Sequence, residues 1–221
     1  SSRAWMSKLN YWALNYADRV ISLSPIMSRQ LIEDGVASHK LEEIYQGVDT
    51  SVFRPVTPKE RTVIRKQLGL DADATYLVFV GSVRHRKGAD ILVSAFIESA
   101  NIFPNLKLII IGQRDFSDHP QQKFRIECNQ FCSALDTQLE LHSMADRVIW
   151  TGNLSPQQVC AYLQASDIFC LPSRLEGVPS APLEAMACGL PVIVSFLDGT
   201  TSQLYTHGQE GFIVNSERST D

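Results

Sequence analysis

Residues 76–96, YLVFVGSVRHRKGADILVSAF, combine a strand, a basic loop and a helix in one short stretch. The run 76–80 is apolar throughout, which is typical of a strand that is buried on both faces of a sheet. Gly81 ends this run, and from Gly88 onwards apolar residues recur at helical spacing. A strand that leads through a loop into a helix is the first half of a β–α–β unit, which builds parallel sheets.

The same alternation continues along the rest of the chain. Strands are predicted over 76–80, 106–111, 147–151, 168–172, 191–195 and 211–215, and helices over 88–100, 121–143, 155–166, 180–188 and 200–206. The helix at 155 is well signalled, because Ser155 can cap it, Pro156 suits its first turn and Gln158 completes a capping box. We therefore predict an α/β fold, a Rossmann-like parallel sheet with helices on both faces. Such sheets bind ligands at the carboxyl ends of their strands.

The N-terminal part follows a different pattern. A helix is expected over 3–18, a strand over 19–24, a helix over 25–35 and a strand over 42–46, before a segment rich in turn residues. The aromatic residues of the first helix favour packing on a core, with a membrane-surface helix as the alternative. We divide the chain into an N-terminal remnant (1–46), a linker (47–58) and the Rossmann-like domain (59–221). Because the chain lacks an initiating Met and a closing helix, we expect it to be a piece of a longer protein.

Composition narrows the function classes. The chain has 221 residues and a net charge of −4, so its overall field disfavours nucleic-acid binding. Its five cysteines form no C-x-x-C pair, and an odd count favours reduced thiols in the cytoplasm. Apolar runs are too short to span a bilayer. We expect a cytoplasmic protein, either free or peripheral to the cytoplasmic face of a membrane.

The basic loop 81–88 is the first candidate binding element. Arg84, Arg86 and Lys87 follow a strand and precede a helix, where their side chains and free backbone N–H groups could together hold a diphosphate. The loop is neither G-x-G-x-x-G nor a P-loop, so the patterns for dinucleotide-dependent dehydrogenases and P-loop enzymes are missing. A solvated basic turn is the alternative interpretation.

Two glutamates eight positions apart form the second candidate element, in SRLEGVPSAPLEAMACGLP (173–191). Gly177 and Pro179 place Glu176 in a loop, whereas Glu184 lies about one turn inside a helix whose predicted N-cap is Ser180. Carboxylates beside a helix N-terminus repel a phosphate unless they face hydroxyl groups. The pair therefore indicates a ligand with both phosphates and hydroxyls, with a solvated surface as the alternative.

Other chemistry-bearing residues carry weaker signals. Asp71-Ala72-Asp73 is a D-x-D string, but it precedes the strand at 76–80 and should be a solvated turn far from the ligand edge. The histidines have no metal-ligand spacing, and only His85, inside the basic loop, draws attention. Gln113, Arg114 and Asp115 follow the strand at 106–111 and either approach a ligand or form an ordinary loop.

Five segments in a fixed order cover most of the chain and are more specific together than any single motif. They are YQGVDTSVFRP (45–55), VFVGSVRHRKGADILVSAF (78–96), LKLIIIG (106–112), VIWTGNLSPQQVCAYLQASDIFCLPSRLEGVPSAPLEAMACGLPVIVS (148–195) and DGTTSQLYTHGQEGFIV (198–214). They resemble the retaining glycosyltransferases of group 1, family four, which have the two-domain GT-B fold. The resemblance implies hexosyl transfer from a nucleotide-diphosphate sugar with retention and without a bound metal or other cofactor. The chain would be mainly the C-terminal, donor-binding half of that fold.

The resemblance also implies roles for individual residues. Lys87 matches the lysine that meets the donor diphosphate, and Gly81 the glycine of the phosphate-facing turn. Glu176 matches the first Glu of the E-x7-E motif, near the donor sugar, and Glu184 the second, which accepts from the ribose hydroxyls. The helix entrance, Gly177, Val178 and Pro179, would bring backbone N–H groups close to sugar and phosphate. The position after the turn glycine is often Arg in the family but is Ser82 here, and Arg84 or Arg86 would compensate.

These implications combine into one expected mechanism. Lys87, a loop arginine and the helix N-terminus stabilise the charge that develops on the departing nucleotide diphosphate, while Glu176 orients the sugar. The acceptor, a glycan, a lipid or a small molecule, would bind mostly to the part missing from the chain, so little transfer is expected from the chain alone. The alternative is a non-catalytic nucleotide- or sugar-binding module, or a degenerate subunit.

Overall fold

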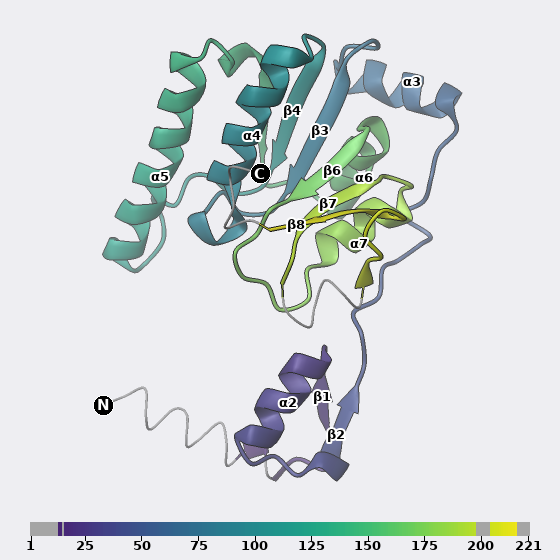
Figure 1. The fold of residues 1–221 in the computed structure, drawn as a ribbon, viewed down its shortest axis with the longest axis vertical. Coiled ribbons are helices and arrows are strands. Elements are labelled where there is room, and N and C mark those ends of the chain that lie inside the picture. Colours follow the sequence, from purple (N-terminus) through teal and green to yellow (C-terminus); the bar gives the residue numbers. More distant parts are fainter. Residues whose placement is uncertain (1–12, 15, 198–203, 216–221) are drawn as a thin grey trace.

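The computed structural model describes residues 13, 14, 16–197 and 204–215. They form a small and a large unit, joined by residues 44–57, which contain neither helix nor strand (Figure 1). The small unit consists of β1 (Val20–Ser22), α2 (Pro25–Glu33) and β2 (Leu41–Glu43), and its two strands are parallel. These strands are shorter than the expected 19–24 and 42–46.

The large unit is built on a parallel six-stranded sheet. Its strands are β3 (Thr75–Val80), β4 (Leu106–Ile111), β5 (Val148–Gly152), β6 (Ile168–Leu171), β7 (Val192–Ser195) and β8 (Gly211–Val214). The spatial order is β5-β4-β3-β6-β7-β8. The chain thus moves outward from β3 to β5, returns to pair β6 with β3, and continues in the opposite direction. This reversal between β3 and β6 is the point where open α/β sheets bind ligands.

Helices cover both faces of the sheet, as predicted. Helices α4 (Ala89–Ile102) and α5 (Gln122–Leu141) lie on one face, and α6 (Pro156–Ala165) and α7 (Ser180–Ala187) lie on the other, where α3 (Pro58–Gln67) packs on α6 (Figure 1). Most residues of the central strands are buried between these layers; Val78, Phe79 and Ile110 have no exposed surface. Within the described residues, no helix is long and apolar enough to cross a bilayer.

The predicted strands of this sheet are confirmed, with ends that differ by at most one residue. The expected helices over 3–18 and 200–206 lie largely outside the described residues. Helix α3 is missing from the sequence prediction, which assigned no element to residues 59–75. Its signal is the capping box of Thr57 and Glu60, the same arrangement that correctly predicted α6 from Ser155 and Gln158.

Candidate functional site

Two loops meet at the reversal point of the sheet. The basic loop 81–88 follows β3, and the loop 172–179, which carries Glu176, follows β6. The backbone N–H of Arg174 donates to the carbonyl oxygen of Arg86 at 2.9 Å. Gly88 has φ 70°, and a Cβ at this position would lie 1.9 Å from the carbonyl oxygen of Pro172. Only glycine permits this approach, so Gly88 allows the two loops to lie in direct contact.

The carboxylate of Glu176 lies where these loops touch. Its Oε1 accepts hydrogen bonds from Lys87 Nζ at 2.6 Å and from Ser173 Oγ at 2.7 Å, and its Oε2 lies 3.4 Å from Arg86 Nη1. The Glu176 side chain is only 6% exposed. A buried carboxylate is stable only with such partners. The structure thus brings together three of the predicted site residues, Arg86, Lys87 and Glu176.

Arg84 lies in the middle of the basic loop, just before the turn that carries Lys87. Its Nε donates to Ser82 Oγ at 2.9 Å, and its guanidinium lies 5.6 Å from the centre of the Phe124 ring. Arg86 instead donates to the carbonyl oxygen of Leu175 at 2.8 Å. Arg84 is therefore the arginine beside Ser82. Among the described residues no carboxylate pairs with Arg84, so its positive charge remains available to an anion.

Gly81, at the end of β3, lies next to the side chain of Lys87. Its N–H donates to the carbonyl oxygen of Ile111, which holds the end of β3 against β4. A Cβ on Gly81 would lie 3.6 Å from Lys87 Cδ, so the lysine stem crosses directly over this residue. The lysine stem therefore lies against the end of β3, and its ammonium group reaches Glu176.

Helix α7 begins at Ser180, so the prediction of Ser180 as the N-cap is wrong. The N-cap is Pro179, with φ −73° and ψ 126°. The N-cap residue of a helix has an extended backbone conformation, and Pro179 has that conformation. Ser180 is therefore the first residue with helical geometry. Pro179 has no N–H, so only Gly177 and Val178 can present backbone donors from the predicted helix entrance.

Glu184 lies in the second turn of α7 and is half-buried. Burial raises the pKa of its carboxyl group above the ordinary value of 4.5. Within the part of the chain that the structure describes, no side-chain or backbone donor bonds to this carboxylate. It differs in this respect from Glu176, and it can accept hydrogen bonds from a ligand.

The weaker candidates have structural partners. Arg114 stacks 4.1 Å above the centre of the Trp150 ring and pairs with Asp136, so it braces β5 against α5. His85 contacts Phe131 edge-on, with ring centres 6.2 Å apart. Asp71 accepts from the N–H of Asp73 and from Lys107 in an exposed turn before β3, as predicted. Among the described residues, no group of His, Cys, Asp or Glu side chains could hold a metal ion.

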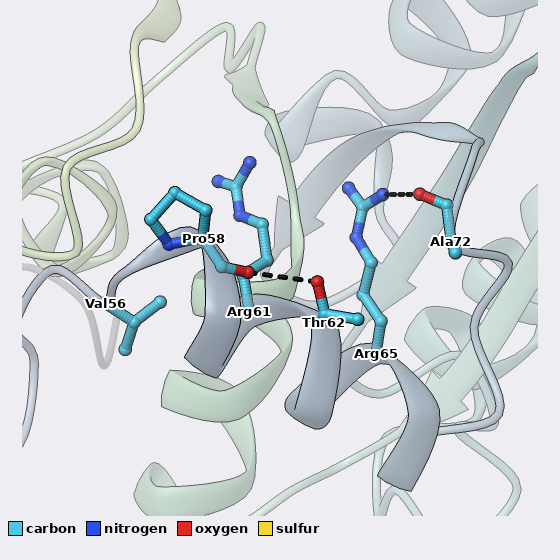
Figure 2. A pocket seen from close by; sticks show the side chains of 6 residues that line it. All are labelled: Val56, Pro58, Arg61, Thr62, Arg65 and Ala72. Carbon is cyan, nitrogen blue, oxygen red and sulfur yellow. Dashed lines mark hydrogen bonds between the residues drawn. The ribbon is translucent and has the colours of Figure 1, made fainter.

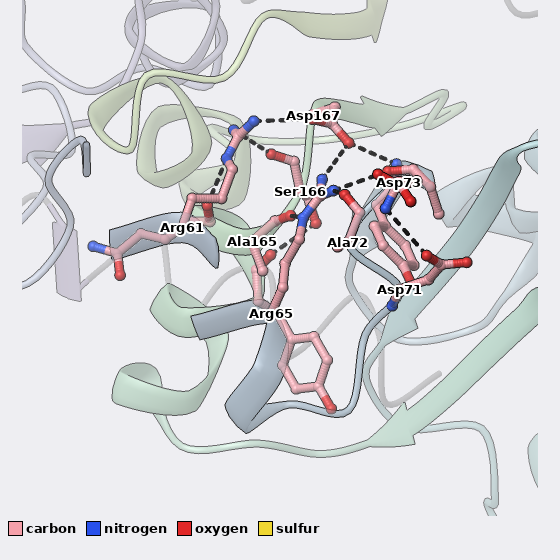
Figure 3. Close-up of polar contacts among 12 residues, drawn as sticks. Arg61, Arg65, Asp71, Ala72, Asp73, Ala165, Ser166 and Asp167 are labelled. Atoms are coloured by element: carbon pink, nitrogen blue, oxygen red, sulfur yellow. Dashed lines mark hydrogen bonds and ion pairs between the residues drawn. The ribbon is translucent and has the colours of Figure 1, made fainter. Parts of the chain in front are cut away.

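A second group of charged residues lies before β3 and β6, at the amino ends of the strands. There a pocket of about 380 Å³ is lined by Val56, Pro58, Arg61, Thr62, Arg65 and Ala72 (Figure 2). Arg65 donates to the carbonyl oxygens of Ala72, Ala74 and Ala165, and Arg61 and Arg65 both pair with Asp167 (Figure 3). These guanidinium groups are already bonded within the protein, so the cluster ties α3 to the end of α6.

Three residues beside the site, Asp90, Ser173 and Arg174, were not predicted from the sequence. Ser173, which is 1% exposed, bonds to Glu176, and Arg174 forms an ion pair with Asp90 across the two loops. In the sequence, these residues could have been found only from their position near Lys87 and Glu176. Serines and Arg–Asp pairs are too common to indicate a site by themselves.

Known proteins that are similar to this chain identify its family. The family model for glycosyl transferases group 1 matches residues 60–221. The chain is 32% identical, over 79% of its length, to 46% of the lipopolysaccharide core biosynthesis mannosyltransferase LpsB of Rhizobium meliloti. It is 28% identical, over 90% of its length, to 42% of the D-inositol 3-phosphate glycosyltransferase of Acidothermus cellulolyticus. The chain thus spans about half the length of the curated relatives it matches.

Solved structures show the same fold. The chain superimposes on Anabaena Alr3699/HepE, in complex with UDP and glucose, with a TM-score of 0.79 at 23% identity, covering 96% of this chain and 54% of that one. Sucrose-phosphate synthase from Thermosynechococcus elongatus gives a TM-score of 0.75 at 26% identity, covering 96% and 49%. The family match extends over the sheet, both site loops and α7, and the structural matches agree with a GT-B glycosyltransferase fold. The chain therefore belongs to the glycosyl transferases group 1 family.

Proposed function

We propose that this chain is the donor-binding part of a retaining, metal-independent glycosyltransferase that transfers a hexose from a nucleotide-diphosphate sugar. The observation that carries the proposal is the contact of Lys87 with Glu176 at the reversal point of the sheet, beside Arg84, which pairs with no carboxylate of the described residues. One small area thus offers cations for a diphosphate and a carboxylate for sugar hydroxyls.

Lys87 and Arg84 hold the diphosphate in this proposal. An ammonium group has three protons, so Lys87 can keep its bond to Glu176 and still donate to a phosphate oxygen. Arg84 takes the place of the arginine that Ser82 replaces, because it lies against the Ser82 side chain. The N–H groups of Gly177 and Val178 add donors. These groups oppose the negative charge that grows on the diphosphate as the glycosidic bond breaks, and they are in place before the reaction.

The two glutamates bind hydroxyl groups. Within the described part of the chain, the Oε2 of Glu176 has only the long contact to Arg86, so it has capacity to accept from the donor sugar and orient it. Glu184 accepts from the ribose, which supplies the hydrogen-bond donors that its half-buried carboxylate does not find among the described residues.

Relatives suggest the substrate class. The matched structures include a protein bound to UDP-glucose, and the curated relatives include a mannosyltransferase and an inositol-phosphate glycosyltransferase. For this chain we propose only that the donor is a nucleotide sugar and that the acceptor is a glycan, a lipid or a small molecule. The proposed location is the cytoplasm, at the inner face of a membrane where the acceptor is a lipid.

A thermal-shift panel tests the proposal. UDP-glucose or GDP-mannose should raise the melting temperature of the chain, with an unchanged shift in the presence of EDTA, whereas NAD and free glucose should not. A shift with glucose alone would favour a sugar-binding module, and a shift with NAD would favour a dinucleotide enzyme. Stabilisation that requires a divalent ion would contradict metal independence.

A further inference from the structure

Asp90 and Arg174 form a two-pronged ion pair between the two site loops. Arg174 Nη1 donates to Asp90 Oδ1 and Nη2 to Asp90 Oδ2, each at 2.7 Å. Asp90 is three residues after Lys87, in the first turn of α4, and Arg174 is two residues before Glu176. The ion pair therefore links the segments that carry Lys87 and Glu176 without touching either side chain.

We propose that Arg174 and Asp90 are positioning residues that fix Lys87 against Glu176 for binding of the donor diphosphate. This inference rests on the proposed function and adds to it two residues that act through Lys87.

Arg174 also orders the turn that carries Lys87. Residues His85–Lys87 form a single 3-10 turn without a side-chain cap. Arg174 Nη1 donates to the carbonyl oxygen of His85 at 2.7 Å, and the Arg174 N–H donates to that of Arg86 at 2.9 Å. One residue thus holds two successive carbonyl groups of this turn, and their orientation sets the direction in which the Lys87 side chain leaves the backbone.

The chemistry of arginine suits this task. Lysine has a flexible four-carbon stem, so the contact of Lys87 with Glu176 cannot by itself fix the distance between the loops. The planar guanidinium of Arg174 meets the carboxylate of Asp90 with two parallel bonds, which fixes both distance and orientation. Both side chains remain about one-third exposed, at 30% and 32%, so the contribution of the pair to global stability should be modest. Its two-pronged geometry instead favours a role in positioning.

A double-mutant cycle tests the inference. We would measure UDP-glucose and GDP-mannose affinity by calorimetry for the chain itself, Arg174→Ala, Lys87→Ala and the double variant. Arg174→Ala should weaken binding about tenfold. In the Lys87→Ala background the same change should alter affinity less than twofold, because the Asp90–Arg174 ion pair, here called the clamp, acts through Lys87. Arg174→Lys should recover only part of the loss, since it restores the charge without the fork.

Controls separate positioning from folding. Arg61→Ala removes a comparable Arg–Asp contact at the amino ends of the strands and should leave affinity unchanged. Circular dichroism establishes that each variant is folded, and Asp90→Asn provides a second way to break the clamp if Arg174→Ala does not fold. If Arg174→Ala and Asp90→Asn bind as tightly as the unaltered chain, or if the losses in the cycle are additive, the positioning role of the clamp is overturned but the proposed function is not. Failure of the unaltered chain to bind either nucleotide sugar would overturn the proposed function and the clamp with it.

Discussion

Lys87 donates a hydrogen bond of 2.6 Å to Glu176, although the two residues are 89 positions apart in the sequence. They meet because β3 and β6 are neighbours at the reversal point of the sheet, so the loops that follow these strands lie side by side. A cation and a carboxylate from different β–α units are thereby combined in one partly buried site.

Lys87→Ala should reduce both nucleotide-sugar affinity and turnover. A hydrogen bond to a charged group contributes about 1.5–3 kcal/mol, so affinity should fall at least tenfold in calorimetry. In a longer, active form of the protein, turnover should fall by about 10² to 10³. Lys107→Ala is the matched control, because Lys107 pairs with Asp71 in an exposed turn before β3. Near-normal turnover of a correctly folded Lys87→Ala variant would refute the role of Lys87.

Glu184→Gln should stabilise the free chain and weaken its binding to nucleotide sugars. Burial raises the pKa of Glu184, so folding favours its protonated form. The protonated Glu184 carboxyl group therefore contributes its full stabilisation at a pH below its pKa in the unfolded chain. This stabilisation is lost as the pH rises through its pKa in the folded chain. At pH 7 the neutral glutamine avoids this loss and should give a higher melting temperature, and the difference should disappear near pH 4. Unchanged nucleotide affinity in the same variant would contradict the ribose role.

Binding to the ribose should also be linked to protons. If its hydroxyls donate to the Glu184 carboxylate, the ionised form is favoured and its pKa falls. Near pH 5, UDP-glucose or GDP-mannose binding should then release protons, seen as a dependence of the calorimetric heat on the ionisation enthalpy of the buffer. The Glu184→Gln variant should lose this dependence, and its persistence would assign the protons to another group.

Gly88→Ala should be strongly destabilising. Its new Cβ would lie 1.9 Å from the carbonyl oxygen of Pro172, which forces the two site loops apart. We expect a loss of at least about 3 kcal/mol in the free energy of unfolding, measured with denaturant. Gly69→Ala is the matched control, since Gly69 has a similar φ of 67° but no atom within 4 Å of the added Cβ. Its cost should be only about 1–2 kcal/mol from left-handed strain. Equal losses would show that strain, and not the contact, determines the effect.

Arg65→Ala should lower stability without changing donor affinity. The Arg65 side chain is 8% exposed, and its removal takes away a donor to the buried carbonyl oxygens of Ala74 and Ala165 and one of the two cations that pair with Asp167. A loss of about 2–3 kcal/mol in unfolding free energy is expected. Lys123→Ala, which removes an ion pair with side chains 90% and 62% exposed, should cost less than about 0.5 kcal/mol. Weaker donor binding by folded Arg65→Ala would connect this cluster to the ligand edge.

The sequence was sufficient to predict the sheet because its strands are mostly apolar runs that few other structures accommodate. The run LKLIII at 106–111 is β4 to the residue, and the loops after β3 and β6 could be recognised from Gly81, Gly88 and Gly177. Helix α3 contains few apolar residues and was missed despite its capping box, because its burial depends on packing against α6.

Individual side-chain contacts could not be read from the sequence. The choice of Arg84 over Arg86 beside Ser82 depends on which way each side chain leaves the loop, and the backbone of a short 3-10 turn determines this. The Asp90–Arg174 pair joins residues 84 positions apart, and its existence depends on the close approach of Gly88 to Pro172.

The position of a bound diphosphate tests the central claim most directly. We would determine a crystal structure of the chain with whichever of UDP-glucose or GDP-mannose gives the larger thermal shift. The diphosphate should lie within hydrogen-bonding distance of Lys87 Nζ and the Arg84 guanidinium, with ribose hydroxyls on the Glu184 carboxylate. A nucleotide sugar bound instead in the pocket between Arg61 and Arg65, at the amino ends of the strands, would contradict the assignment of the donor site.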